Sequence, residues 1–355
     1  MNERVTLRDL ARITGVHFTT VGLALRNDSR ISPATAAKVQ AAARQYGYTE
    51  DAMLSALSTY RHRNSHRFGG VIAYLTTYCP EDTLKTNVTE RLLVEAATAY
   101  AQARNFNLEL FQINAPGMTA ERMSKLLWAR NIQGLILSPR LPDPGPMEDL
   151  EWKNFSTVAI GFSVTNLNVH RVCAHQTHNT RLCIAQLRER GYRRIGLIMA
   201  REVYERSRGL VLGAYLSEQA LHPAAGQVTP LFLPGAEITQ ARVQHWLREQ
   251  RVEAVALSSQ PLEICAFLEG LGYGIPRDIG VALVARYGQT DHIAGIDERM
   301  HALGEAAVDA VITLISHNER GLAEYPRYSF VEGCWVERPS VCALPFVEEP
   351  IRRAS

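Results

Sequence analysis

Long apolar runs are missing from this sequence. No stretch of about 18 apolar residues occurs, which excludes a helix that crosses a membrane. The start, MNERVTLRDL, lacks the hydrophobic core of a secretory signal, so we expect a cytoplasmic protein. Six cysteines are scattered over 355 residues without Cys-x-x-Cys spacing. They indicate neither a zinc site nor a disulfide framework, and buried or incidental thiols are expected.

Catalytic signatures are missing as well. The chain has no Gly-x-Ser-x-Gly elbow, no His-Glu-x-x-His pair and no phosphate-binding loop. The run Gly270-x-Gly272-x-Gly274 follows a predicted helix and precedes a predicted strand, the reverse of the order that dinucleotide binding requires. His175 and His178 have no Cys or Glu partner at ligand spacing. We therefore expect no enzyme, no cofactor and no metal site.

The charges are unevenly distributed. Hydrophobic residues make up 46% and charged residues 21% of the chain, as in an ordinary globular protein. Residues 1–67 hold ten Lys/Arg and five Asp/Glu, whereas the remainder holds 28 basic and 31 acidic residues. A basic head on a mildly acidic body suits attraction to phosphates at the head, although charge alone fits a solvated surface equally well.

The first 26 residues have the pattern of two short helices joined by a tight turn. Thr6 and Asp9 form a Thr-x-x-Asp capping box, and Gly15 suits the left-handed conformation that ends a helix. A second helix is predicted from Phe18. Two short helices across a Gly-containing turn form the DNA-binding helix-turn-helix, whose second helix enters the major groove. The positions expected to face inward are Leu7, Leu10, Ala11, Ile13, Val21, Ala24 and Leu25.

A third helix is predicted over ISPATAAKVQAAARQYGY. Ser32 is its cap, Pro33 lies in its first turn and Gly47 ends it. The stretch AMLSALS follows. With VTLRDLARITGV, TTV and AL in this order, residues 5–57 resemble the headpiece of the LacI-type (lac and purine repressor) family of bacterial transcription regulators. We place the headpiece domain, with its hinge helix, at 1–57. In this resemblance AMLSALS matches the hinge helix of the family.

The remainder of the chain has the sequence pattern of an α/β protein. Residues 58–67, STYRHRNSHR, are polar and basic and indicate a linker. From Phe68, predicted strands and helices alternate and the order then repeats, which indicates two lobes of parallel sheets flanked by helices, with a ligand cleft between them.

The resemblance extends over this part of the chain and implies a two-lobed, periplasmic-binding-protein-like effector domain at 68–345. In the family the chain crosses between the lobes three times, and we place these crossings near 163, 288 and 324. The first lobe would then comprise 68–163 and 288–324, and the second 164–287 and 325–345.

The resemblance also implies which headpiece side chains contact DNA. Phe18, Thr19 and Leu23 match positions that touch base edges. Phe18 and Thr19 can make apolar contact with a thymine methyl, and the Thr19 hydroxyl can form a hydrogen bond with a base. An alternative role for Phe18 is packing against the third helix. The residues placed for phosphates are Thr6, His17 and Arg26.

Leu57 matches the hinge leucine that, in relatives, inserts into the minor groove at the centre of the operator. Apolar wedges of this kind unstack a base step and kink the duplex. The alternative is that Leu54 and Leu57 only pack two helices together. The hinge begins here with Glu50-Asp51 instead of the Pro-Asn-like pair common in the family, although Asp51 remains a good cap.

For the effector, the resemblance points to five residues, Arg206, Arg208, Ser259, Gln260 and Arg286. Arginines only donate hydrogen bonds, so this set favours an anionic or carboxylated ligand. In the alternative, the arginines pair with Glu202 or Glu205 or point into solvent. The ligand is then neutral and is bound through Ser259, Gln260 and aromatic stacking.

The sequence thus predicts a sequence-specific DNA-binding transcription regulator, expected to be a repressor. It would bind palindromic double-stranded DNA as a homodimer under the control of a small-molecule effector. The dimer is expected to form through the helix at 84–104 and a counterpart surface on the second lobe. The tail after Trp335 has no leucine heptad, so no coiled-coil tetramer is expected. The alternatives are a solute-binding-protein-like sensor without specific DNA recognition, and an enzyme with an accessory DNA-binding head.

Overall fold

The computed structural model describes residues 5–25, 28, 30–48, 70–77, 85, 87–139, 149–223, 226–233, 239–259, 261–286 and 290–342. The predicted hinge helix AMLSALS, the linker 58–67 and three candidate site residues, Arg26, Leu57 and Gln260, lie outside the described residues.

The described part of the headpiece forms three helices, namely α1 (Leu7–Thr14), α2 (Phe18–Leu25) and α3 (Pro33–Gln45). The predicted capping box is confirmed. The Asp9 N–H donates to Thr6 Oγ1 at 3.3 Å, and the Thr6 N–H donates to Asp9 Oδ2 at 3.0 Å. Gly15 follows α1 with φ +71°, the left-handed conformation that its lack of a side chain favours. These local signals fix the angle at which α1 meets α2.

The headpiece has its own apolar core. The predicted inward position of Ile13 is wrong, because its side chain is 43% exposed. Thr14 is buried in its place and its hydroxyl donates to the Leu10 carbonyl at 2.6 Å. Leu10 and Thr14, four residues apart, share one helical face, and they are the buried residues of α1. The buried hydrophobic members of the core are Leu10, Val21, Ala24, Val39, Ala42 and Ala43.

The first lobe is built on a six-stranded sheet in which every pairing is parallel. Its strands, in sheet order, are β11 (Tyr328–Val331), β5 (His170–Ala174), β4 (Ser156–Ile160), β3 (Gly134–Leu137), β1 (Gly70–Thr76) and β2 (Phe106–Gln112).

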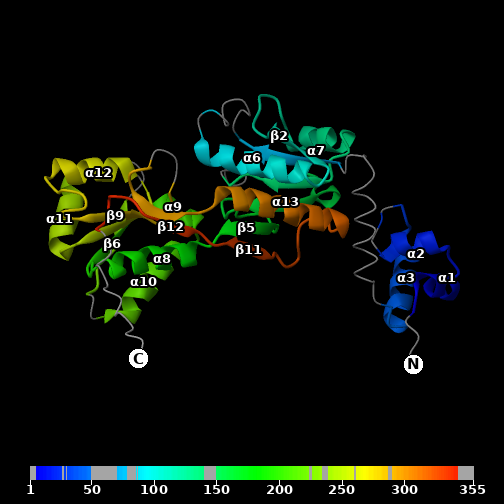
Figure 1. The fold of residues 1–355 in the computed structure, drawn as a ribbon. Coiled ribbons are helices and arrows are strands. Elements are labelled where there is room, and N and C mark those ends of the chain that lie inside the picture. Colours follow the sequence, from blue (N-terminus) through cyan, green and yellow to red (C-terminus); the bar gives the residue numbers. More distant parts are fainter. Residues whose placement is uncertain are drawn as a thin grey trace, which may run out of the picture.

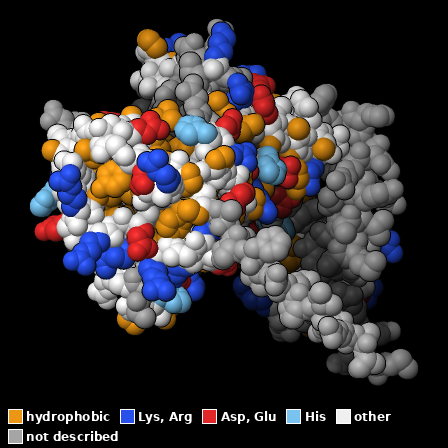
Figure 2. Space-filling model, turned by 60° about the vertical axis from the view of Figure 1, so that its left-hand side comes forward, with side chains coloured by type: hydrophobic (Ala, Val, Ile, Leu, Met, Phe, Trp, Pro, Cys, Tyr) orange, Lys and Arg blue, Asp and Glu red, His pale blue; other side chains and the backbone are white. Residues whose placement is uncertain are grey.

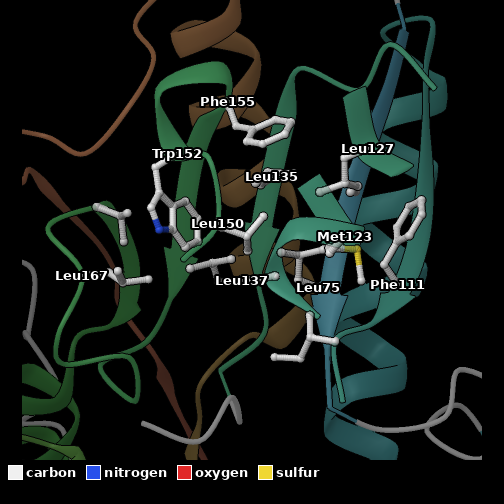
Figure 3. Packing of buried hydrophobic residues seen from close by; sticks show 14 of the residues in the cluster. Leu75, Phe111, Met123, Leu127, Leu135, Leu137, Leu150, Trp152, Phe155 and Leu167 are labelled. Atoms are coloured by element: carbon white, nitrogen blue, oxygen red, sulfur yellow. The ribbon is translucent and has the colours of Figure 1, made fainter. Parts of the chain in front are cut away.

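Helices cover both faces of this sheet (Figure 1). One face packs against α6 (Val88–Gln102) and α13 (Met300–Ser316), which lie side by side. The other packs against α7 (Ala120–Ala129) and the short 3₁₀ turn η1 (Trp152–Asn154). In that second layer Trp152 and Phe155 pack beside leucines of the central strands (Figure 3). Burial on both faces explains why the central strands β1, β3 and β4 are largely apolar.

The second lobe repeats the design with a second six-stranded sheet. Only its edge strand β12 runs antiparallel to its neighbour. One face packs against α11 and α12, and the other against α8 and α10. The strands, in sheet order, are β12 (Cys334–Val336), β10 (Ala294–Asp297), β9 (Gly280–Leu283), β8 (Ala254–Leu257), β6 (Ile195–Ala200) and β7 (Leu231–Leu233). The helices are α8 (Gln176–Glu189), α9 (Arg201–Arg206), α10 (Leu210–Leu221), α11 (Gln240–Gln250) and α12 (Pro261–Gly270).

The three crossings between the lobes lie about ten residues later than the sequence placed them. β5 and β11 pair in the first sheet, although both were assigned to the second lobe, and β10 pairs in the second sheet although it was assigned to the first. The chain therefore crosses between β5 and α8, between β10 and α13, and between β11 and β12. Each crossing adjoins an edge or next-to-edge strand, so the connections gather along one side of the two sheets.

Candidate DNA interface and ligand cleft

The start of α2 presents an exposed aromatic side chain. Phe18 is 47% exposed and lies outside the hydrophobic cluster of the headpiece. Its ring packs beside that of His17, with the centroids 4.5 Å apart. Packing against α3 therefore does not account for Phe18, and an apolar ring is held at the surface where α2 begins.

His17 and Thr19 form a local polar pair beside Phe18. His17 Nδ1 lies 2.7 Å from the Thr19 hydroxyl, and the Val21 N–H donates to the His17 carbonyl at 3.0 Å, which starts the helix. Both side chains are exposed, whereas Leu23, one turn later, is half-buried. The face that α2 turns to solvent thus carries one aromatic ring, one imidazole and one hydroxyl.

The basic side chains of the headpiece fall into two groups. Arg12 and Arg30 lie near Asp9 and Asp28, at 3.6 and 2.8 Å. The Asp9 pKa is lowered, chiefly by the hydrogen bonds from Thr6. Three further basic residues are exposed and form no ion pair with any described residue, namely Arg8, Lys38 and Arg44. These three are available for phosphates.

A cavity of about 600 Å³ lies between the two lobes. Ile160 and Ala174 reach it from the carboxyl ends of β4 and β5, and Leu257 and Leu283 from those of β8 and β9. Ligands of open parallel sheets bind at this end of the strands. The volume lies within the range of small-molecule sites. Both lobes line the cavity, so a ligand held there contacts both.

The polar residues that line the cavity include a buried carboxylate. Glu298 follows β10, is only 2% exposed and accepts a hydrogen bond from Gln176 Nε2 at 2.8 Å. Gln176 begins α8 immediately after the first crossing. Thr290, Ser163 and Arg206 also line the cavity. The cleft thus offers acceptors and donors on a largely apolar wall, as ligand sites do.

The structure brings together only part of the predicted effector set. Arg206 and Ser259 line the cavity. Arg208 does not line it but lies behind one of its walls. Arg208 Cζ lies 5.7 Å from the centroid of the Phe162 ring, and Nη1 donates to the Tyr328 hydroxyl at 3.3 Å. This arginine comes from the second lobe and contacts the first.

Arg286 also lies away from the cavity lining. It donates through Nε to the Ile293 carbonyl at 3.0 Å and through Nη2 to the Thr290 carbonyl at 3.3 Å. Burial, followed by the charge of Arg338, lowers its pKa. Arg286 therefore fastens the loop that carries Thr290, and its guanidinium is turned to backbone oxygens instead of a ligand.

Three cleft residues were missed by reasoning from the sequence, namely Phe162, Gln176 and Glu298. Glu298 stands directly after β10, and Phe162 and Gln176 stand two residues after β4 and β5, at the end of the strands where parallel sheets place their ligand-binding side chains. Glu298 follows the strand that ends GID, and an acidic residue at the end of a parallel strand indicates a ligand-binding position. Phe162 and Gln176 adjoin β4 and β5, and β5 itself had not been recognised as a strand.

Comparison with known proteins supports the division into headpiece and body. Residues 6–51 match the family of bacterial regulatory proteins described as the lacI family. The chain is 28% identical over 137 residues to the HTH-type transcriptional regulator TreR of Escherichia coli (strain K12), which is 39% of either chain. It is 24% identical over 286 residues to TreR of Salmonella typhimurium, covering 73% of this chain and 84% of that regulator.

Solved structures share the fold over nearly the whole chain. The transcriptional regulator CelR in complex with cellobiose superimposes with a TM-score of 0.57 at 20% identity, covering 95% of this chain and all of CelR. The lac repressor dimer bound to operator and the anti-inducer ONPF gives a TM-score of 0.54 at 17% identity, covering 96% of this chain and all of that one. At such identities the likeness establishes the architecture of headpiece and two lobes.

Proposed function

Because the chain belongs to the lacI family of bacterial regulatory proteins, we propose that it is a sequence-specific DNA-binding transcription regulator controlled by a small molecule in the cleft. The observation that carries the proposal is a capped helix-turn-helix with an exposed α2 face, in one chain with a two-lobed body around a cavity of about 600 Å³. Repression is the expected mode.

In the proposed complex α2 lies in the major groove. Phe18, Thr19 and Leu23 contact base edges, and Thr6 and His17 contact phosphates. Arg26 and Leu57 belong to the same proposal, Arg26 at a phosphate and Leu57 as a wedge in the minor groove. One headpiece contacts few base pairs, so two headpieces on a palindromic site supply the specificity.

The regulator acts as a homodimer in this proposal. Leu92 is 46% exposed on α6, and Leu262 is 47% exposed on α12 of the other lobe. Figure 2, in which the second lobe comes forward, shows hydrophobic side chains at the surface between basic and acidic ones. We expect Leu92→Arg to convert the dimer to a monomer, because an arginine in an apolar contact must be desolvated without a partner. Light scattering measures the mass, and an unchanged dimer would place the interface elsewhere.

The DNA contact of Phe18 is tested by substitution. Phe18→Ala should weaken operator binding about tenfold, the scale of one base-pair mismatch, and leave non-specific binding almost unchanged. The operator is first obtained by selection from a random DNA pool, which should return a two-fold site. Leu221→Ala, a 65% exposed residue of the second lobe, is the matched control. A pool without two-fold symmetry, or equal losses on specific and random DNA, would contradict the proposal.

The cleft residues indicate the class of effector. Glu298 accepts hydrogen bonds and Arg206 donates them, and a hydroxyl can pair with either. We therefore infer a polyhydroxylated small molecule, with Gln176 and Thr290 as further polar contacts. The expectation of an anionic or carboxylated ligand depends on three arginines, of which Arg206 alone lines the cavity.

A thermal-shift screen of sugars, sugar phosphates and dicarboxylates identifies the ligand, and calorimetry follows it. Glu298→Gln should reduce affinity about tenfold or more, because a charge-assisted acceptor is lost in a buried site. Arg206→Gln should cost less, since Arg206 is exposed. The control is Glu305→Gln, an exposed residue of α13 outside the cavity lining. Binding only by dicarboxylates, or no loss in Glu298→Gln, would refute the inferred class.

Members of the family are regulators, and the proposal assigns no catalysis to this chain. None of the helices in the described part of the chain is long and apolar enough to cross a membrane. A regulator that binds operators works where the DNA is, and we place it in the cytoplasm. The alternative, a ligand sensor without specific DNA recognition, would show a thermal shift with the effector but no selected DNA site.

A further inference from the structure

A second cavity, of about 320 Å³, lies within the first lobe. Thr157 and His170 line it from the amino ends of β4 and β5, and His317 lines it from the turn after α13. The segment Glu319–Ala323 closes it. The ligand cleft lies at the carboxyl ends of the same two strands, so the cavities occupy opposite ends of one sheet. In Figure 1 this region lies at the end of α13 that points away from the second lobe.

The cavity wall contains a buried hydroxyl without a partner. Thr157 is only 3% exposed, and its Oγ1 forms no hydrogen bond with any described residue. Nearly all buried polar groups in folded proteins are paired, and an unpaired one is costly. The neighbouring Ser156 does have a partner, because its hydroxyl donates to the Glu319 carbonyl at 2.7 Å. The Thr157 hydroxyl is therefore available to a molecule bound in the cavity.

A histidine supplies a second donor. His170 Nδ1 accepts from the Arg327 backbone N–H at 3.0 Å, so the neutral ring carries its proton on Nε2. Burial, together with the charge of Arg327, lowers the pKa of His170 and keeps the ring neutral. Nε2 lies 3.8 Å from Glu319 Oε2, beyond hydrogen-bond distance. Nε2 also lies 3.4 Å from Arg327 Nη2, which is itself a donor. With no acceptor within hydrogen-bond distance among the described residues, the Nε2–H can donate to a ligand.

Of the two arginines beside the cavity, Arg327 pairs with Glu319, whereas Arg320 has donors that form no ion pair with a described residue. Glu319 is neutralised by Arg327, whose Nη2 donates to Oε2 at 2.6 Å. Arg320 lines the cavity, and its guanidinium makes one long contact with a described side chain, from Nη2 to Gln133 Oε1 at 3.5 Å. The carbonyls of Leu314 and Ile315 at the end of α13 are already occupied, by the N–H groups of Glu319 and Asn318.

We propose that this second cavity is a binding site for a small oxyanion, a carboxylate or a phosphate. Arg320, the His170 Nε2–H and the Thr157 hydroxyl donate to the oxygens of the anion. A guanidinium with uncommitted donors, next to two neutral donors, is the arrangement that planar or tetrahedral oxyanions pair with. The site is separate from the effector cleft and does not depend on its ligand.

Calorimetry and thermal unfolding of the full chain with inorganic phosphate test the proposal, with sodium chloride at matched ionic strength as the blank. Phosphate should raise the unfolding midpoint by binding the native state. Arg320→Gln should weaken phosphate binding about tenfold or more, and Thr157→Val about threefold. Lys125→Gln, at an exposed residue of the first lobe, is the control and should retain full binding. Arg206→Gln and Lys38→Gln report whether phosphate binds in the cleft or the headpiece instead.

Succinate replaces phosphate in a second series to distinguish the two sources of the anion. Binding of either one with loss in both Arg320→Gln and Thr157→Val supports the site and identifies its class. An equal response in wild type and Arg320→Gln places the anion elsewhere, and a response abolished by Arg206→Gln or Lys38→Gln places it in the cleft or headpiece. Either result overturns the proposal. No response to phosphate or succinate at millimolar concentrations means that water alone fills the cavity, which also overturns it.

Discussion

Gly304→Ala should lower the free energy of unfolding by about 3 kcal/mol, the upper end of the usual range for adding atoms to a packed core. A Cβ at this position would lie 2.4 Å from the Leu93 carbonyl oxygen and 3.1 Å from the Ala97 nitrogen. Both atoms belong to the backbone of α6, which cannot rotate away as a side chain would. Urea denaturation monitored by circular dichroism measures the loss.

The matched control is a glycine in another helix. Gly213 lies in α10 with open space around the position of a Cβ, so Gly213→Ala should stabilise the protein by about 0.5 to 1 kcal/mol through the lower entropy of the unfolded chain. Opposite signs at the two glycines would show that α6 and α13 are held in contact. A loss below about 1 kcal/mol for Gly304→Ala would mean that the two helices separate easily.

The headpiece could be predicted almost residue by residue because its signals are local. A capping hydroxyl, an acidic residue three positions later and a left-handed glycine act over one or two turns. Thr6, Asp9, Gly15 and Ser32 all take the predicted roles. The error at Ile13 arose at the level of packing, where the choice between Ile13 and Thr14 depends on where α2 and α3 lie.

The first lobe boundary could not be predicted because a charged residue disguises the strand before it. β5 contains Arg171, which is 3% exposed and donates to the carbonyls of Gly161, Val164 and Leu167. Arginine is almost never fully buried unless it is paired, so the sequence HRVCA did not indicate an interior strand. Its partners are backbone oxygens of a loop that the strand itself positions, a relation invisible before folding.

Which single side chains line the cleft could not be predicted from the sequence either. Arg286 and Glu298 stand in similar places after β9 and β10, yet one fastens a loop and the other lines the cavity. Because ligands of parallel sheets bind at the carboxyl ends of the strands, the sequence indicates the approximate location of the site. Which side chain turns inward depends on the neighbouring backbone, here the Thr290 and Ile293 carbonyls that engage Arg286.

Operator affinity should fall roughly a thousandfold between 50 and 200 mM salt. Arg8, Lys38 and Arg44 have no acidic partner among the described residues of the headpiece, and a dimer presents this set twice. About six phosphate contacts release as many counterions, and the logarithm of affinity then falls about five times as steeply as that of salt rises. Fluorescence anisotropy on the selected operator measures the slope.

Two comparisons separate this effect from general screening. Lys38→Gln should reduce the slope by about two, because each dimer loses two phosphate contacts, whereas Lys125→Gln in the first lobe should leave it unchanged. Lys125 is a suitable control because it is exposed, is paired with Glu121 on α7 and lies outside the headpiece. Effector binding at the buried Glu298 should vary little over the same range, since screening acts mainly on exposed charges. A flat salt dependence for DNA, or equal slopes for DNA and effector, would mean that the basic headpiece is a solvated surface and that α2 does not bind the duplex.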